Sequence, residues 1–495
     1  MTTCDVIVVG GGGSGLAAAA TAAELGRSVT LLEKEAQLGG STAWSVGSIS
    51  ATGTQQQRAK GLRDHPDAHF EDLEILAGAM RNRDNRQLRR LLVDNITDTF
   101  GWLESTGLVF TGPNDEPPHR LPRMHNVLPN SRAFPEILGR YCRKLGVDVR
   151  TGTVADGLII EDNRVVGVRA CAADGRVHEL AARGGVVLAG GDYSANAEMK
   201  AQLAGPETAN LAAVNPAAGG QAIALALEIG AQVINGDIIR GPIMRFIPPT
   251  RESLLRRLPA SRWLALTLRW SLEHLPRSVQ RPFAMSFLTT ALGPSKDLFE
   301  AGAILINSEG RRFCDELDQP AHAVPDQPGQ IAYIVLDGTI AERFVAWPHV
   351  VSTAPGIAYA YLDDYRRNRK DIFHQADDIA GLATQLGVAA DTLHEAITAT
   401  ATESSAARPP LTRAPYIALG PVKSYVVFTD GGLNVTERLE VIGQDNTAIA
   451  GLYAAGSTGQ GGVLLEGHGH HLGWAFVSGR IAGRNAAMET TAHPN

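Results

Sequence analysis

The chain has 495 residues, 44% of them hydrophobic, and a formal net charge of -7 at pH 7. This length predicts about three domains around a large core, and the acidic balance argues against a nucleic-acid partner. The four cysteines have no C-x-x-C spacing, so neither a metal site nor a disulfide framework is predicted. No apolar run has the length of a membrane span, and the first predicted strand leaves no room for a signal peptide. A cytoplasmic globular protein is expected.

The stretch Asp5–Lys34 has the pattern of a dinucleotide-binding unit. Val6–Val9 predicts a buried strand, and the G-x-G-x-x-G spacing follows where an alanine-rich helix begins. Val29–Leu32 predicts a second strand that ends at Glu33. An acid in this place accepts the hydroxyls of the adenosine ribose and disfavours a 2′-phosphate.

A second glycine-rich loop, Leu38 to Gly47, follows at once and is placed to close over a long cofactor. A nicotinamide site does not need such a loop. The far C-terminal run Gly451–Gly456 and the tail Ser478–Ala487 complete a pattern that spans most of the chain.

This pattern resembles the FAD-dependent flavoproteins of the fumarate reductase and succinate dehydrogenase family, and is nearest in character to their 3-ketosteroid dehydrogenase branch. The resemblance implies an α/β fold: a Rossmann-like FAD-binding domain of the glutathione-reductase type, interrupted by a smaller α+β capping domain. The expected parts are residues 1–297 (FAD-binding, with 240–296 unplaced), 298–427 (capping) and 428–495 (return to the FAD-binding domain).

The resemblance also implies which residues hold FAD. Covalently flavinylated relatives carry a histidine in the loop after the double glycine, and 41–54 has none, so noncovalent FAD is expected. Ser457 replaces the family glutamate that contacts the flavin ribitol. The expected cofactor residues are Gly10, Gly12, Gly13, Ser14, Gly15, Glu33, Lys34, Gly39, Gly40, Ser41, Thr42, Gly47, Val154, Ala189, Gly190, Asn196, Gly456, Ser457, His471 and Leu472.

Three anion-binding positions of fumarate reductases differ here. Val427 replaces a histidine, while Pro320 and His471 replace arginines. A dicarboxylate with so few cations would be poorly bound, although a protonated His471 would replace one charge. Contacts with substrate are expected from Val427, Phe428, Thr429 and Gly469.

Ketosteroid dehydrogenases place tyrosine or serine hydroxyls shortly before the glycine that matches Gly469. This chain has Leu464–His468 there, so Glu466 and His468 are predicted to transfer the proton. His470 and His322 are further catalytic candidates. The alternative is that the His-x-His-His run only binds backbone or an adventitious metal.

The predicted function is dehydrogenation or ene-reduction of a carbon–carbon bond beside a ketone in a hydrophobic, cyclic or steroid-like substrate. A hydride would pass between substrate and flavin N5, and a side chain would handle the proton. Two alternatives stay open: a reductase of fumarate-like unsaturated acids, and a flavin-bearing binding or assembly protein with little turnover. The electron donor or acceptor is not identified.

Helices are expected near 72–90 and over 95–107. The strands 157–161 and 164–169 are expected to form a hairpin through Asp162-Asn163.

The segment 261–275 predicts an amphipathic helix that Pro276 ends. Arg262, Arg269 and Glu273 share one stripe, and tryptophan and leucine occupy a wide apolar remainder. Two interpretations stay open: a surface helix packed on the core, or a lipid-facing or substrate-entry helix with peripheral membrane contact.

Overall fold

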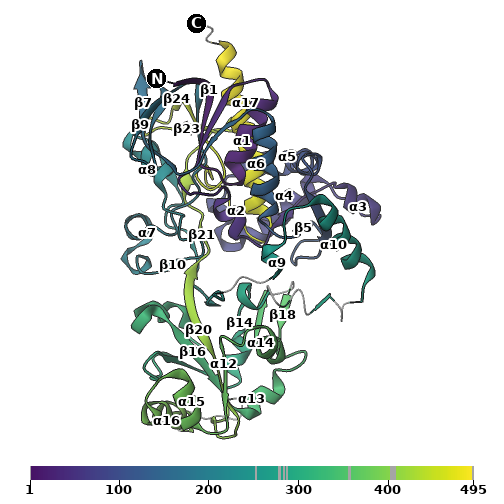
Figure 1. Cartoon of the computed structure of the whole chain (residues 1–495), viewed down its shortest axis with the longest axis vertical. Coiled ribbons are helices and arrows are strands. Elements are labelled where there is room, and N and C mark those ends of the chain that lie inside the picture. Colours follow the sequence, from purple (N-terminus) through teal and green to yellow (C-terminus); the bar gives the residue numbers. More distant parts are fainter. Residues whose placement is uncertain are drawn as a thin grey trace.

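The computed structural model describes residues 2–250, 254–276, 280–281, 285, 288–354, 358–401 and 408–492. Figure 1 shows two parts: an upper one that holds both termini and the helices α1 (Gly13–Glu24) and α17 (His470–Ala492), and a lower one. The long strand β20 (Tyr416–Val426) runs in the lower part and leads back towards the upper one.

The upper part is built on a sheet with the order β23-β24-β8-β9-β1-β2-β6, with β7 paired to β8. β1 lies between β2 and β9 and is parallel to both, and its residues Val6–Val9 are buried. The strands are β1 (Thr2–Val9), β2 (Val29–Leu32), β6 (Asp148–Arg150), β7 (Thr153–Glu161), β8 (Arg164–Ala172), β9 (Val177–Leu188), β23 (Glu440–Ile442) and β24 (Ala448–Ala454). The predicted α/β fold is confirmed, including the hairpin at Asp162 and Asn163, which both have positive φ as a tight two-residue turn requires.

The two ends of the chain meet where α17 crosses α1. A Cβ atom on Gly479 would lie 2.3 Å from the carbonyl oxygen of Ser14, and one on Gly483 would lie 2.2 Å from that of Ala18. Only glycine permits this approach. The crossing brings the first turns of both helices to the same end of the sheet.

The remaining helices of the upper part are α2 (Gly40–Trp44), α3 (Gln55–Ala59), α4 (Pro66–Ala77), α5 (Arg86–Ser105), α6 (Ala133–Lys144), α7 (Ala197–Ala204), α8 (Gln221–Glu228), α9 (Leu254–Arg257) and α10 (Arg262–His274). Short strands pair as β3 (Ser48–Ser50) and β4 (Val109–Asn114) with β5 (Met124–Leu128), β11 (Val233–Ile234) with β22 (Gly432–Leu433), and β12 (Ile239–Arg240) with β21 (Phe428–Thr429). The predicted helix 261–275 is confirmed as α10.

The lower part has its own sheet and core. The sheet contains β10 (Ala212–Ala213), β13 (Ile243–Phe246), β15 (Ile304–Asn307), β16 (Ala332–Leu336), β19 (Phe373–Ala376) and β20, and a small second sheet contains β14 (Gly293–Pro294), β17 (Ser352–Ala354) and β18 (Ala358–Ala360). Its helices are α12 (Lys296–Glu300), α13 (Gly338–Arg343), α14 (Leu362–Asn368), α15 (Ile379–Leu386) and α16 (Ala390–Thr398). Along the whole chain, the short 3-10 turns are η1 (Gly78–Arg83), η2 (Pro206–Thr208), η3 (Pro320–His322), η4 (Val324–Asp326), η5 (Pro328–Gln330) and η6 (Ala399–Ala401).

The segment 240–296, which the sequence left unplaced, divides between the two parts. Met244 and Phe246 are buried in the core of the lower part, whereas Ala260 is buried in the core of the upper part. The chain therefore crosses to the capping sheet at β13 and returns to the upper part before α10.

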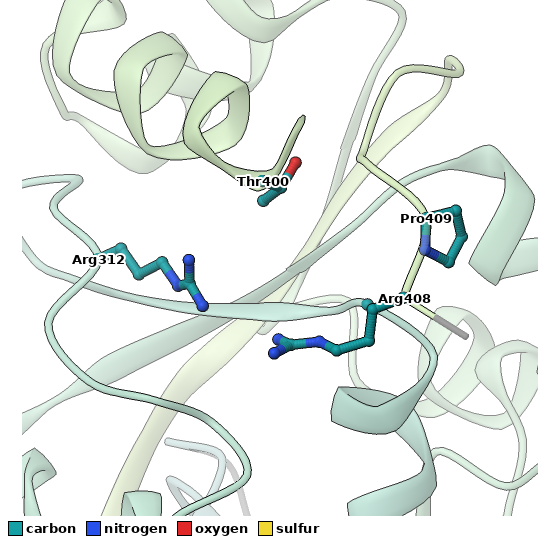
Figure 2. A pocket seen from close by; sticks show the side chains of 5 residues that line it. Arg312, Thr400, Arg408 and Pro409 are labelled. Atoms are coloured by element: carbon teal, nitrogen blue, oxygen red, sulfur yellow. The ribbon is translucent and has the colours of Figure 1, made fainter. Parts of the chain in front are cut away.

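The run 312–316 of the lower part, which reads Arg-Phe-x-x-Glu, has a structural role. Two nitrogens of Arg312 donate to Glu316 at 2.8 Å, and Arg408 donates to it at 3.0 Å. Glu316 is buried, which raises its pKa, but hydrogen bonds from Arg312 and the amide of Leu305 hold that pKa below its usual value. Figure 2 shows both arginines pointing into one hollow of about 10 Å³, too small for a ligand. Glu316 thus links Arg312, Arg408 and the strand β15 within the lower part.

Candidate active site

The dinucleotide turn leaves no room for side chains on its protein side. Gly10 has a φ of +110°, and a Cβ there would lie 2.4 Å from the carbonyl oxygen of Ala189. A Cβ on Gly15 would lie 1.8 Å from the carbonyl oxygen of Gly10. The strand end, the turn and the first turn of α1 are thus in direct backbone contact.

The second glycine loop lies against this turn. The amide of Gly39 donates to the carbonyl of Gly11 at 3.0 Å, and the amide of Gly13 donates to Oγ1 of Thr42 at 3.0 Å. Glu33 accepts the amide of Gly11 at 2.7 Å, and burial raises its pKa. The second glycine loop and Glu33, the acid at the end of β2, therefore both contact the turn Gly11–Gly13.

The turn is open on its other side. A Cβ on Gly12 would have only the carbonyl oxygen of Gly39 nearby, at 3.8 Å, and one on Gly191 would have no atom within 4 Å. Gly12 is the N-cap of α1 and has no side-chain cap, so the first-turn amides of Ser14 and Gly15 are available to a phosphate, whereas that of Gly13 donates to Thr42. A pyrophosphate fits this backbone cradle.

Other predicted cofactor residues gather around the cradle. A Cβ on Gly456 would lie 2.6 Å from Oγ of Ser14, which brings the C-terminal glycine turn against α1. Thr458 donates to the carbonyl of Gly191 at 2.9 Å, so the 189–191 turn joins the same group. Gly40, Gly190, Ser457 and Leu472 belong to these same turns and helix starts.

Several predicted cofactor residues are held by protein groups. Lys34 donates to the carbonyl of Ala217 at 2.5 Å, Asn196 caps α7 through the amide of Met199, and Ser41 accepts from Asn215. Val154 is 39% exposed on β7, next to Thr153, whose amide donates to the carbonyl of Glu33. Gly47 packs against Val127, and a Cβ on Gly469 would lie 2.4 Å from the amide of Ser50. These contacts give Lys34, Asn196, Gly47 and Gly469 structural roles.

A network of charged side chains lies at the junction of β12 and β21. Nε of Arg240 donates to Asp430 at 2.6 Å, and Nη1 of Arg240 forms an ion pair with Glu466. Asp430 is fully buried and also accepts from Gln460 at 2.9 Å. Burial raises the pKa of Glu466, and Arg240 opposes that rise. Glu466 is thus an ion-paired carboxyl group whose pKa lies above its usual value.

Three buried polar atoms around Asp430 have no hydrogen-bond partner among the described residues: Oγ1 of Thr429, Oε1 of Gln460 and Nε2 of His471. The ring of His471 lies 3.8 Å from that of Phe428, centroid to centroid. Because unsatisfied buried groups are rare, this cluster fits a bound molecule with hydrogen-bonding groups. Burial lowers the pKa of His471 to about 4, so it is neutral at pH 7 and adds no positive charge in place of the arginine.

His470 lies in a second, fully buried group of imidazoles. Its Nδ1 is 2.5 Å from the carbonyl of Glu466 and its Nε2 is 3.1 Å from Nε2 of His69. Since a carbonyl only accepts, Nδ1 of His470 carries the proton, and His69 donates to its Nε2 while accepting from Thr52 at 2.6 Å. Burial holds the pKa of both imidazoles well below the usual value. His470 is therefore a neutral group that positions the loop of Glu466.

The other two catalytic candidates lie apart from the Arg240 network. Nδ1 of His468 is 2.8 Å from Glu116, and its side chain is 44% exposed. His322 is exposed on η3 of the lower part. Val427 donates its amide to the carbonyl of Arg240, which places the backbone of the substrate candidates Val427–Thr429 along β12.

Sequence reasoning missed Arg240, Gln460, His69 and Glu116. Arg240 lay in the unplaced segment, and its one signal was its position before Gly241-Pro242, a break that ends a short strand. The region of Glu116 and His69 carried no legible motif. Their places are visible only in the fold: Arg240 and Gln460 meet at Asp430, whereas His69 and Glu116 contact His470 and His468.

The comparisons with known proteins agree with this geometry. The model of a family described as FAD binding domain matches residues 5–242 and 275–465. The chain is 27% identical to the NADH:fumarate oxidoreductase of Klebsiella pneumoniae (strain 342) over 98% of its own length, but it spans only 47% of that relative. It is 26% identical to the vinyl phenol reductase of Lactiplantibacillus plantarum (strain ATCC BAA-793 / NCIMB 8826 / WCFS1), with 98% of this chain and 97% of the relative covered.

Solved structures show the same architecture. The open conformation of a flavocytochrome c3 fumarate reductase superposes with a TM-score of 0.74 at 25% identity, covering 99% of this chain and 79% of that one. Structures of 3-ketosteroid dehydrogenases share the fold at 19% and 22% identity. The backbone cradle, the matched family and these superpositions together show that the chain belongs to the FAD-binding-domain family of fumarate reductase-type flavoproteins, with FAD as its cofactor.

Proposed function

We propose that the chain is an FAD-dependent oxidoreductase that forms or reduces a carbon–carbon double bond beside a ketone in a hydrophobic, cyclic or steroid-like substrate. The observation that carries this proposal is the pair formed by Glu466 and Arg240 near Oγ1 of Thr429 and Nε2 of His471, two buried atoms that lack a short hydrogen bond among the described residues. Glu466 can transfer the proton, and the polar atoms can contact substrate or flavin. The positive charge of Arg240 is already matched by Asp430 and Glu466.

The charge of the site supports an uncharged substrate. Arg240 already faces two carboxylates, Asp430 and Glu466, and burial keeps His471 neutral at pH 7. Val427 and Pro320 occupy two further places where a dicarboxylate would need cations. Burying a dianion without matching cations is strongly unfavourable. The name of the vinyl phenol reductase shows that this family includes a reductase whose substrate is not a dicarboxylate.

In the proposed reaction, bound FAD supplies the hydride chemistry at its N5. The amides of the cradle and of the first turn of α1 hold the pyrophosphate. Glu466 gives a proton to the substrate carbon during reduction, or takes one during dehydrogenation; burial raises its pKa, and Arg240 fixes its position. His470 fixes the backbone carbonyl of Glu466.

Reduction of a fumarate-like acid is the second candidate, favoured by the names of several relatives. In that case Arg240 would have to exchange one of its carboxylate partners for the substrate. A flavin-absorbance screen separates the two candidates: the prereduced protein is mixed anaerobically with unsaturated acids, and with steroid, terpenoid and other cyclic enones. Reoxidation by enones supports the proposal, and a response confined to the acids overturns it.

The cofactor attachment has its own test. Because 41–54 has no histidine, acid precipitation should release FAD into the supernatant. Flavin that stays with the pellet would contradict noncovalent binding. A colourless protein that cannot be reconstituted with FAD would contradict the proposed activity altogether.

A further inference from the structure

The helix α10 exposes a row of large aromatic side chains away from the core. Trp263 is 83% exposed and Trp270, seven residues later on the same face, is 56% exposed. The opposite face is anchored, because Ala265 is buried against Val109 and Leu128 together with Leu266 and Leu268. The helix therefore packs on the β4–β5 hairpin, and its two tryptophans face outward and are not part of the buried apolar face.

The segment that carries these tryptophans is basic although the whole chain carries a net charge of -7. The segment 256–274 has four arginines, Arg256, Arg257, Arg262 and Arg269, and one acid, Glu273. Tryptophan and arginine on one exposed helix are typical of interfacial helices, in which rings enter the headgroup region and cations meet anionic lipids.

The neighbouring helix α6 extends the positive surface. Arg140 of α6 donates to the carbonyl of Ala260 at 2.8 Å, and Glu136 accepts the amide of Ala260, so α6 and the segment before α10 are joined. Beside this junction, Arg132, Arg140 and Arg143 line a hollow of about 450 Å³ together with Glu136. A hollow of this size with an excess of guanidinium groups fits a lipid phosphate headgroup.

We infer that the outward face of α10, with the arginines of 256–269 and with Arg140 and Arg143 of α6, is a docking surface for a bilayer that contains anionic phospholipid. The occupant is identified by charge complementarity and by the two projecting indole rings. No helix among the residues that the structure describes is long and apolar enough to cross a bilayer. The inferred contact is therefore peripheral and salt-dependent.

Vesicle sedimentation of the full chain with bound FAD tests this inference. Binding to phosphatidylcholine vesicles that contain phosphatidylglycerol is expected, with little binding to pure phosphatidylcholine and a decrease as salt rises. The double variant Trp263→Ala/Trp270→Ala should bind about tenfold more weakly. Each of Arg257→Gln and Arg262→Gln should weaken binding about fivefold.

The control is Trp347→Ala in the lower part, since Trp347 is also largely exposed, at 71%. It should bind vesicles as the wild type does. Flavin absorbance and the thermal midpoint confirm that each variant is folded. Vesicle binding that the double variant leaves unchanged, or a self-association that this variant abolishes without any lipid binding, would overturn the inference; the second result would assign the surface to another copy of the chain.

Discussion

The glycine cradle and the Arg240 network belong to the same site and are built in different ways. The cradle consists of backbone held by local turns, such as the contact between Gly15 and Gly10. The network consists of side chains from 240, 430 and 466, which are far apart in sequence. The cradle should therefore be sensitive to any added atom, whereas the network should be sensitive to the loss or gain of a single charge.

The largest expected effect comes from removing the charge at the end of the network. Glu466→Gln keeps the shape of the side chain but cannot transfer the proton, so flavin reoxidation by substrate should slow by about two to four orders of magnitude. Stopped-flow absorbance measures this rate, and FAD binding should be unchanged. Glu342→Gln, in an exposed ion pair of the lower part, is the control.

His468→Ala, measured in the same way, distinguishes the two proton-transfer candidates. The contact between His468 and Glu116 places its imidazole outside the Arg240 network. Wild-type rates in Glu466→Gln together with a large loss in His468→Ala would transfer the catalytic role to His468.

A buried ion-pair cluster around Arg123 should affect stability next most strongly. Arg123 bridges Asp64 and Asp72, and all three side chains are fully buried. Arg123→Met removes the ion-pair partner of Asp64 and leaves Asp72 with Arg120 alone, so it should lower the free energy of unfolding by about 3–5 kcal/mol. Urea denaturation measures this difference. The matched surface pair, broken by Arg366→Met, should cost less than about 1 kcal/mol because both partners are exposed. Equal losses would contradict the importance of burial.

Two buried imidazoles, His471 beside the network and His125 on β5, give the stability of the protein a pH dependence. Burial lowers the pKa of His125 and of His471 to about 4, so between pH 6.5 and 4 the unfolded chain binds protons that the folded chain does not. The free energy of unfolding should therefore fall as pH falls through this window, by about 3 kcal/mol for each group at most.

Thermal midpoints measured from pH 7 to 4 test this dependence. The raised pKa values of Glu33 and Glu466 act in the opposite direction, since a carboxyl protonated earlier in the folded state gains stability as pH falls. His125→Gln isolates one imidazole and should have a smaller pH slope than the wild type. An unchanged slope would show that His125 is not the group responsible.

The smallest effect concerns one added carbon in the cradle. Gly12 has a φ of -78° and an open Cβ direction, so Gly12→Ala should fold normally while its methyl group meets the FAD pyrophosphate. FAD affinity should weaken by about 1–3 kcal/mol, as in overpacked sites. Titration by flavin fluorescence measures it. Gly101→Ala in α5, where a Cβ meets no atom within 4 Å, should retain full affinity. A lower thermal midpoint of FAD-free Gly12→Ala would instead indicate a protein clash.

The sequence predicted β1, β2, the β7–β8 hairpin and α10 because apolar periodicity and turn residues act over a few positions. Its helix boundaries near 72–90 and 95–107 were wrong. α4 ends at Ala77 and α5 begins at Arg86, because Asn85 accepts the amides of Gln87 and Leu88 and so caps a new helix. Such a polar residue is an ambiguous signal within a charged stretch.

By itself, the sequence determined the cofactor cradle, since glycine spacing restricts the backbone locally. The resemblance to ketosteroid dehydrogenases also made Glu466 a candidate, through its place before Gly469. Tertiary structure alone decided that Arg240 faces Glu466 and Asp430, that His470 binds a carbonyl and that His471 stays neutral. Ion pairs and pKa values depend on distances and burial that arise when remote segments pack, and no local pattern encodes them.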